Sequence, residues 1–178
     1  LITGEALGIG DFNNPSDIYY DNEKFIYLLD SGNSRIVVID ALNYSLARVI
    51  EPVDRGGERI AFSEATGLFV RKNGEIYVAD KGAGTVYIFD NGGKLFDNIN
   101  KPESDLLSSD FAYKPSKVAV DSNGIVYVIS FGCYSGALQF DAEHNFLGFY
   151  GSESVTMTAK LVLEKMWAKI VPKSMSSN

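Results

Sequence analysis

The chain has 178 residues, 46% of them hydrophobic, with 16 basic and 23 acidic side chains and a formal net charge of −7. This length and composition suffice for the packed core of one ordinary domain, which excludes a disordered polypeptide. The acidic charge without a dense Lys/Arg run argues against nucleic-acid binding, and the single cysteine, Cys133, excludes an intrachain disulfide or a multi-cysteine metal site.

Residues 1–14 are expected to be a connecting segment before the first repeat. They contain neither the basic region nor the apolar core of a signal peptide. No stretch of the chain approaches the roughly eighteen apolar residues of a membrane span. Because the chain begins at Leu1 and not at an initiating Met, we expect a processed product or a segment of a longer protein.

A phrase of about 27 residues then occurs three times, starting at Pro15, Ala65 and Pro115. Equivalent residues recur at an interval of fifty positions, which indicates a repeat architecture. The residues that display this interval are Tyr27, Tyr77 and Tyr127, and Gly32, Gly82 and Gly132.

Each repeat contains four short runs rich in Ile, Val, Tyr and Phe, separated by Asp, Asn, Ser and Gly, which is typical of strands joined by tight turns. We label these strands A to D. The pairs Asn73-Gly74, Asn91-Gly92 and Asn123-Gly124 favour type I′ hairpin turns, because glycine adopts positive φ without strain. The predicted units are blades at 15–50, 65–99 and 115–150, separated by long loops at 51–64 and 100–114.

Strand B is a nearly continuous apolar run in every repeat, at 25–29, 76–79 and 125–129. Such a strand needs cover on both faces of its sheet, as when the sheet is stacked between two neighbours. Repeated four-stranded sheets of this kind are the blades of a β-propeller. We therefore predict an all-β protein with three four-stranded antiparallel sheets and a repeat of about 50 residues.

The repeats resemble those of the NHL-repeat β-propeller family. The first repeat is the nearest match, since its segment Asp30-Ser31-Gly32-Asn33-Ser34-Arg35-Ile36 stands where the family has Asp-x-Gly-Asn-x-Arg-Ile. The likeness covers about residues 12–150. The second repeat keeps Asp80 and Gly82 but lacks the Asn-x-Arg, and the third has Ser130 in place of the aspartate.

We interpret the phrase as structural. Asp30 is expected to cap a turn, Asn33 to occupy the turn in the left-handed region, and Arg35 to bridge to a neighbouring blade. The predicted structural motif comprises Asp30, Gly32, Asn33, Arg35, Gly82 and Gly132.

The segment 156–171 predicts a C-terminal amphipathic helix, and 172–178 reads as a disordered tail. Apolar residues at Leu163, Met166, Trp167, Ile170 and Val171 follow helical spacing, and Pro172 ends the pattern.

Three blades do not close a propeller ring, which has four to eight blades. The two outer sheet faces must be covered. Ring closure is expected either from missing blades of a longer chain or from homodimerisation of two half-rings.

The long D–A loops lie on the same face of a propeller as the B–C loops, and binding residues concentrate on long loops over a rigid scaffold. Exposed Arg, Tyr and Phe are typical of binding hot spots. The predicted binding residues on this face are Arg55, Arg59, Asp80, Lys81, Tyr113, Phe131 and Tyr134.

Catalytic patterns are weak. His144 is the sole histidine and falls in a C–D turn on the opposite face, where we expect a surface turn residue. Cys133 has no His or basic partner in sequence, which favours inert burial over nucleophilic catalysis. We predict no catalytic residue, no bound metal and no cofactor.

The leading hypothesis is a non-catalytic binding or scaffold module that recognises a protein, peptide or glycan through its D–A and B–C loops. The alternative, which the resemblance implies, is part of a metal-dependent propeller enzyme of the lactone hydrolase or lyase type whose remaining blades carry the ligands. A purely structural spacer is a third hypothesis. The resemblance and the acidic composition favour an extracellular or cell-surface bacterial protein.

Overall fold

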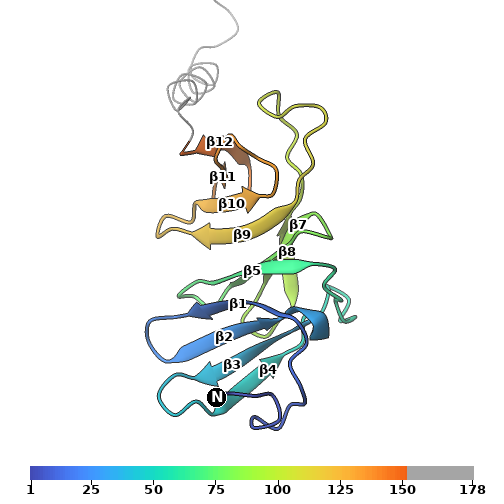
Figure 1. The fold of residues 1–178 in the computed structure, drawn as a ribbon. Helices are drawn as coiled ribbons and strands as arrows, with labels where there is room; N and C mark the ends of the chain where they lie inside the picture. Colours follow the sequence, from blue (N-terminus) through green and yellow to red (C-terminus); the bar gives the residue numbers. More distant parts are fainter. Residues whose placement is uncertain (152–178) are drawn as a thin grey trace, which may run out of the picture.

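The computed structural model describes residues 1–151, which form three antiparallel sheets stacked in succession (Figure 1). Each sheet contains four consecutive strands, and neighbours in sequence are neighbours in the sheet. This arrangement confirms the predicted all-β class and the count of three four-stranded sheets. The helix predicted at 156–171 and the tail predicted at 172–178 lie outside the described residues.

The strands of sheet 1 are β1 (Pro15–Tyr20), β2 (Phe25–Asp30), β3 (Arg35–Asp40) and β4 (Leu46–Ile50), with the short 3-10 helix η1 (Ser31–Asn33) between β2 and β3. The strands of sheet 2 are β5 (Ala65–Val70), β6 (Ile76–Asp80), β7 (Thr85–Phe89) and β8 (Leu95–Ile99). The strands of sheet 3 are β9 (Pro115–Val120), β10 (Val126–Ser130), β11 (Ala137–Phe140) and β12 (Phe146–Tyr150). We call the sheets blades 1 to 3.

The first strands of the three blades lie next to one another. β5 contacts both β1 and β9, and the three strands lie one above another in Figure 1. Hydrogen bonds join these strands from blade to blade: the Ser16 hydroxyl donates to the Ala65 carbonyl at 2.8 Å, and the Thr66 hydroxyl donates to the Ser116 carbonyl at 3.0 Å. The first strand of each blade is therefore its inner edge.

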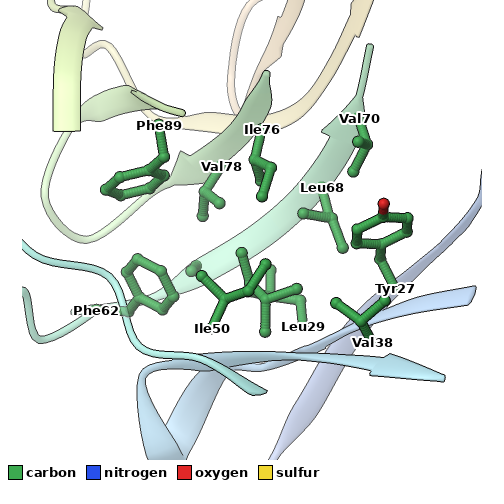
Figure 2. Close-up of a cluster of buried hydrophobic side chains, with 12 residues drawn as sticks. Tyr27, Leu29, Val38, Ile50, Phe62, Leu68, Val70, Ile76, Val78 and Phe89 are labelled. Atoms are coloured by element: carbon green, nitrogen blue, oxygen red, sulfur yellow. The ribbon is translucent and has the colours of Figure 1, made fainter. Parts of the chain in front are cut away.

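Two apolar cores lie between the blades. The first joins blades 1 and 2, where Leu29, Ile50 and Phe62 meet Leu68 and Val78 (Figure 2). The second joins blades 2 and 3. As predicted from its continuous apolar sequence, β6 is buried at every residue, because blade 2 is covered on both faces.

The outer blades each have one face without a neighbouring sheet. Equivalent positions show the effect: Leu29 and Ala79 are 0% exposed beneath the next blade, whereas Ile129 on blade 3 is 49% exposed. Ile18 on the opposite, outer face of blade 1 is 63% exposed. How these faces are covered stays a prediction. Between residues 1 and 151, no helix is long and apolar enough to cross a membrane.

The turn type predicted for the Asn-Gly pairs is wrong. A type I′ turn needs positive φ at both central residues, but none of the three asparagines has it. In the β5–β6 connection, the Gly74 N–H donates to the Arg71 carbonyl and only Gly74 adopts positive φ, at 90°. Asn123-Gly124 repeats this geometry, and in the β7–β8 connection the positive φ falls on Gly93. In each turn, three residues that end in a left-handed glycine lie between a hydrogen-bonded pair, which is Arg71 and Glu75, Asp90 and Lys94, or Asp121 and Ile125.

Candidate functional site

The loop that enters each blade is held by a side chain at the end of the second strand. In blade 1 the Asp30 carboxylate accepts the Asn13 N–H at 2.7 Å, and in blade 2 the Asp80 carboxylate accepts the N–H groups of Ser63 and Glu64, each at 2.8 Å. In blade 3 the Ser130 hydroxyl accepts the Lys114 N–H at 2.9 Å. The serine therefore takes over the acceptor role of the aspartates.

The NHL-like phrase anchors the segment before blade 1. Asp30 is fully buried and accepts from Asn33 Nδ2 at 2.8 Å and from Arg35 Nε at 2.6 Å. The Arg35 guanidinium also donates to the carbonyls of Ile9 and Asp11. Among the described residues, Arg35 therefore contacts the N-terminal segment and not a neighbouring blade, which corrects the expected bridge.

The turn residue in the left-handed region is Ser34, with φ 50°, and not Asn33 as predicted. Asn33 Nδ2 is instead used to hold Asp30 and to donate to the Asp11 carbonyl at 2.9 Å. Because Asp30, Asn33 and Arg35 all bind one another or the backbone, their role in this geometry is structural.

The three motif glycines meet two different requirements. A Cβ on Gly32 would lie 2.7 Å from the Asn13 carbonyl oxygen, and one on Gly82 would lie 2.9 Å from the Ser63 Cβ. Gly132 has open space around it but adopts φ 80°. The first two glycines therefore permit a close approach of the entering loop, whereas the third permits a left-handed backbone.

Two of the predicted binding residues do not reach the surface. Asp80 is 0% exposed and uses its carboxylate on backbone N–H groups, including that of Ala83. Tyr113 is 6% exposed, and its hydroxyl has no hydrogen-bond partner among the described residues. Burial raises the pKa of the Tyr113 hydroxyl.

Arg55 and Arg59, which were predicted to share a binding face with Phe131 and Tyr134, make their contacts elsewhere. The loop at 51–64 runs along the outer edge of blade 2, where Val53 exchanges hydrogen bonds with Gly93 and Leu95. Arg55 there donates to the Phe96 carbonyl at 2.9 Å. Arg59 donates to the Asn33 carbonyl at 2.9 Å and pairs with Glu51 at 3.1 Å.

Three predicted residues lie on the loops after β6 and β10, where Phe131 and Tyr134 are exposed and Lys81 is partly buried. Phe131 is 67% exposed and Tyr134 is 99% exposed. The Lys81 Nζ lies 5.6 Å from the centre of the Phe131 ring and 2.5 Å from Glu64 Oε1. A cavity of about 330 Å³ lies beside Phe131 and is lined also by Asp110, Phe111 and Lys114. We call Lys81, Phe131 and Tyr134 the aromatic patch.

Sequence reasoning missed a larger cavity of about 780 Å³ between blades 1 and 2. It lies at the opposite ends of the strands, beside the β1–β2 and β5–β6 turns. Repeat periodicity predicts which strands face each other but not how well their side chains fill the space between them. The sequence did contain one indication of this difference. At equivalent turn positions the first repeat has Asp21 and Phe25 where the second has Arg71 and Glu75.

His144 is less exposed than predicted. It occupies the β11–β12 turn as expected, but its side chain is only 15% exposed and its Nδ1 lies 2.6 Å from Asp97 Oδ2 on β8. Cys133 is partly buried, with its sulfur 3.6 Å from the Gly136 carbonyl. Within residues 1–151, no group of three His, Cys, Asp or Glu side chains is placed to hold a metal ion.

Known proteins share both the repeat and the fold. Residues 12–39 match the NHL repeat model. Protein strictosidine synthase-like 4 of Arabidopsis thaliana is 33% identical over 131 residues, which cover 71% of this chain and 32% of that relative. The chain thus spans about a third of the curated relative that it matches.

Solved structures resemble the three blades at low sequence identity. Hydrazine synthase of Kuenenia stuttgartiensis superposes with a TM-score of 0.56 at 12% identity, over 80% of this chain and 38% of that chain. A streptogramin B lyase superposes with a TM-score of 0.52 at 13% identity, over 75% of this chain and 39% of that one. These likenesses concern the fold alone. Residues 12–39 are an NHL repeat, and the described chain is a partial β-propeller of three blades.

Proposed function

We propose that the chain is a non-catalytic binding module that recognises a peptide segment of a partner protein through its aromatic patch. The observation that carries this proposal is the exposure of Phe131 and Tyr134, at 67% and 99%, on loops anchored to rigid strands. Aromatic side chains supply much of the energy of protein interfaces when a partner buries them.

The aromatic patch suits a protruding partner side chain. Phe131 borders the 330 Å³ cavity, whose lining combines apolar Phe111 with the charged groups of Asp110 and Lys114. Lys81 lies over Phe131 and pairs with Glu64, so a cation stands beside the ring in the unbound chain. A peptide that places an apolar side chain in this cavity would bury Phe131, and Tyr134, three residues further along the same loop, offers a second exposed aromatic ring.

A glycan is the less favoured ligand at the aromatic patch. Phe131 and Tyr134 project from their loop into solvent, at 67% and 99% exposed. A projecting aromatic pair matches the anchor side chains of protein interfaces.

The alternative is part of a metal-dependent propeller enzyme of the lactone hydrolase or lyase type. Its support is the similarity to a relative named strictosidine synthase-like, of which this chain matches 32%. Residues 1–151 do not assemble three potential metal ligands, so the enzyme hypothesis needs groups from outside this part of the chain. An extracellular or cell-surface bacterial location stays a prediction.

The test is a selection of random twelve-residue peptides, displayed on phage, against the full immobilised chain. Affinities of the selected peptides are then measured by calorimetry for the wild type, Phe131→Ala and Tyr134→Ala. We expect each substitution to weaken binding about tenfold or more, as for a hot-spot aromatic. Phe96→Ala is the matched control, because Phe96 is an exposed aromatic on β8, at 45%, outside the aromatic patch.

Selected peptides whose affinity is unchanged by both substitutions would overturn the proposal. So would a screen in which only glycans, and no peptides, bind in a manner that depends on Phe131.

A further inference from the structure

A cavity of about 780 Å³ opens between blades 1 and 2, at the strand ends away from the aromatic patch. Its inner wall includes Tyr27 of β2 and Val70 of β5, which Figure 2 shows beside each other. Its outer end is crossed by Arg48, whose Nη2 donates to Asn91 Oδ1 at 2.5 Å. The cavity therefore has an apolar floor and a polar rim contributed by both blades.

The equivalent space between blades 2 and 3 is smaller: the cavity there is about 420 Å³ and is lined by Phe69, Arg71, Val120 and Asp121 among others. There Arg71 Nη1 pairs with Glu75 Oε2 at 2.6 Å, the Tyr77 hydroxyl contacts the same carboxylate at 3.4 Å, and Arg71 reaches toward Gly124 of blade 3. The residues fifty positions earlier are Asp21 and Phe25.

Asp21 and Phe25 cannot replace that ion pair. Asp21 Oδ1 accepts the N–H groups of Glu23, Lys24 and Phe25, so the carboxylate is directed to its own turn. Burial of the Asp21 carboxylate acts to raise its pKa, but the backbone hydrogen bonds to the carboxylate outweigh burial, and the pKa is lowered. The Phe25 ring, with no charge to pair, leaves the cleft between blades 1 and 2 open. The cavity between blades 1 and 2, at about 780 Å³, is thus larger than the one of about 420 Å³ between blades 2 and 3.

The lining of the cavity between blades 1 and 2 combines aromatic rings with carboxylates, cations and amides. Aromatic rings come from Tyr19, Phe25 and Tyr27, and the Tyr27 ring packs edge to face against each of the other two. Carboxylates come from Asp21 and Glu23, cations from Arg48, Arg71 and Lys72, and amides from Asn22, Asn73 and Asn91. Because Arg71 is already paired with Glu75, the lining has no strong excess of either charge.

This chemistry selects among ligand classes. An anionic ligand is favoured by a clear excess of cations, and a purely apolar ligand by a lining with few polar groups. Aromatic rings beside alternating donors and acceptors match a ligand with apolar ring faces and many hydroxyl groups. The volume of about 780 Å³ lies within the range of small-molecule sites. We propose that the cleft between blades 1 and 2 binds a neutral saccharide of one or two rings.

The test uses the full chain and saturation-transfer difference NMR, followed by calorimetry. The probes are glucose, galactose, mannose and N-acetylglucosamine, with cellobiose, maltose and chitobiose as dimers. Glucuronate and glucosamine serve as charged comparators. We expect at least one neutral probe to bind, and to bind no more weakly than its charged analogue.

Two pairs of variants locate the site. Ala47→Trp fills the cavity from an exposed position on β4, and we expect binding to weaken about tenfold or more. Ser45→Trp places the same side chain at an exposed position outside the cavity and should leave affinity within about twofold. Arg48→Ala removes a rim donor and should weaken binding about fivefold, whereas Arg55→Ala removes a cation elsewhere and should not.

The proposal is overturned if no neutral probe gives a saturation-transfer signal at about 10 mM, a concentration that detects millimolar binding. It is equally overturned if only charged probes bind, or if Ala47→Trp binds as well as Ser45→Trp. The aromatic patch is tested separately, since Phe131→Ala should retain saccharide binding while losing peptide binding. A negative result for saccharide binding therefore does not bear on the peptide-binding proposal, and the reverse also holds.

Discussion

The imidazole of His144 joins two blades through Asp97: its Nδ1 lies 2.6 Å from Asp97 Oδ2, although 47 residues separate them in sequence. His144 sits in the β11–β12 turn with φ 64°, and Asp97 lies on the outer strand of blade 2. The contact therefore couples a left-handed turn of blade 3 to the outer edge of blade 2.

We expect His144→Asn to lower the free energy of unfolding by about 0.5–1 kcal/mol. Asparagine tolerates the left-handed backbone but is too short to keep the contact with Asp97. Urea denaturation followed by circular dichroism measures the change. Tyr44→Asn is the matched control, because Tyr44 has φ 59° at the corresponding turn of blade 1 and is 55% exposed. Equal losses in both variants would contradict a specific role for the Asp97 contact.

Asp30 should contribute more to stability than any other residue of the NHL phrase. Asp30→Ala leaves the Arg35 guanidinium, which is 12% exposed, without its buried partner. We expect a loss of about 3–5 kcal/mol, enough to unfold most of a marginally stable domain. The measurement is the midpoint of thermal unfolding.

Asp80→Ser provides the comparison for Asp30→Ala. Blade 3 already uses Ser130 as the acceptor at this position, so a serine at 80 keeps one hydrogen bond to the entering loop. Asp80 has no cation bound to its carboxylate among the described residues, and its partners are backbone N–H groups. We expect a loss of about 1–2 kcal/mol. A loss as large as that of Asp30→Ala would show that the ion pair with Arg35 is not the main contribution.

Gly32 and Gly132 should respond differently to alanine. In Gly32→Ala the new Cβ would meet the backbone oxygen of Asn13, which cannot move without breaking its hydrogen bond to the Gly32 N–H. We expect a loss of about 2–3 kcal/mol. Gly132→Ala meets only the cost of a left-handed backbone, about 1 kcal/mol. Denaturant midpoints of the two variants test this order, and the reverse order would contradict the steric account.

The sheets were predictable from sequence because short runs rich in Ile, Val, Tyr and Phe are bounded by turn residues, and the fifty-residue interval aligns the three copies. The turn geometry was not, because an Asn-Gly pair does not by itself set the length of the turn. The Arg71 N–H donates to the Glu75 carbonyl and the Asp121 N–H to the Ile125 carbonyl, so three residues lie between the paired positions and positive φ falls on the last of them, Gly74 or Gly124. A type I′ turn has only two residues between its paired positions.

The candidate sites were predictable only in part. Phe131 and Tyr134 are exposed, as their place on a predicted loop suggests, and their role in binding stays a prediction. Tyr113 has the same residue type on a predicted loop, yet it packs into the second core. Sequence alone does not say which loop aromatic turns inward, since that depends on the space left between blades 2 and 3.

Tyr113→Phe should stabilise the protein, because the buried Tyr113 hydroxyl has no partner among the described residues. We expect a gain of about 1 kcal/mol at pH 7, measured by urea denaturation. The gain should widen at high pH. Burial raises the pKa of Tyr113 above its ordinary value of 10.0, so the folded state keeps a proton that the unfolded state releases, and the wild type loses stability as pH rises above 10. Phenylalanine has no such proton, and the difference between the two proteins isolates this residue from the other tyrosines. A difference that stays constant from pH 7 to 11 would contradict the buried, neutral hydroxyl.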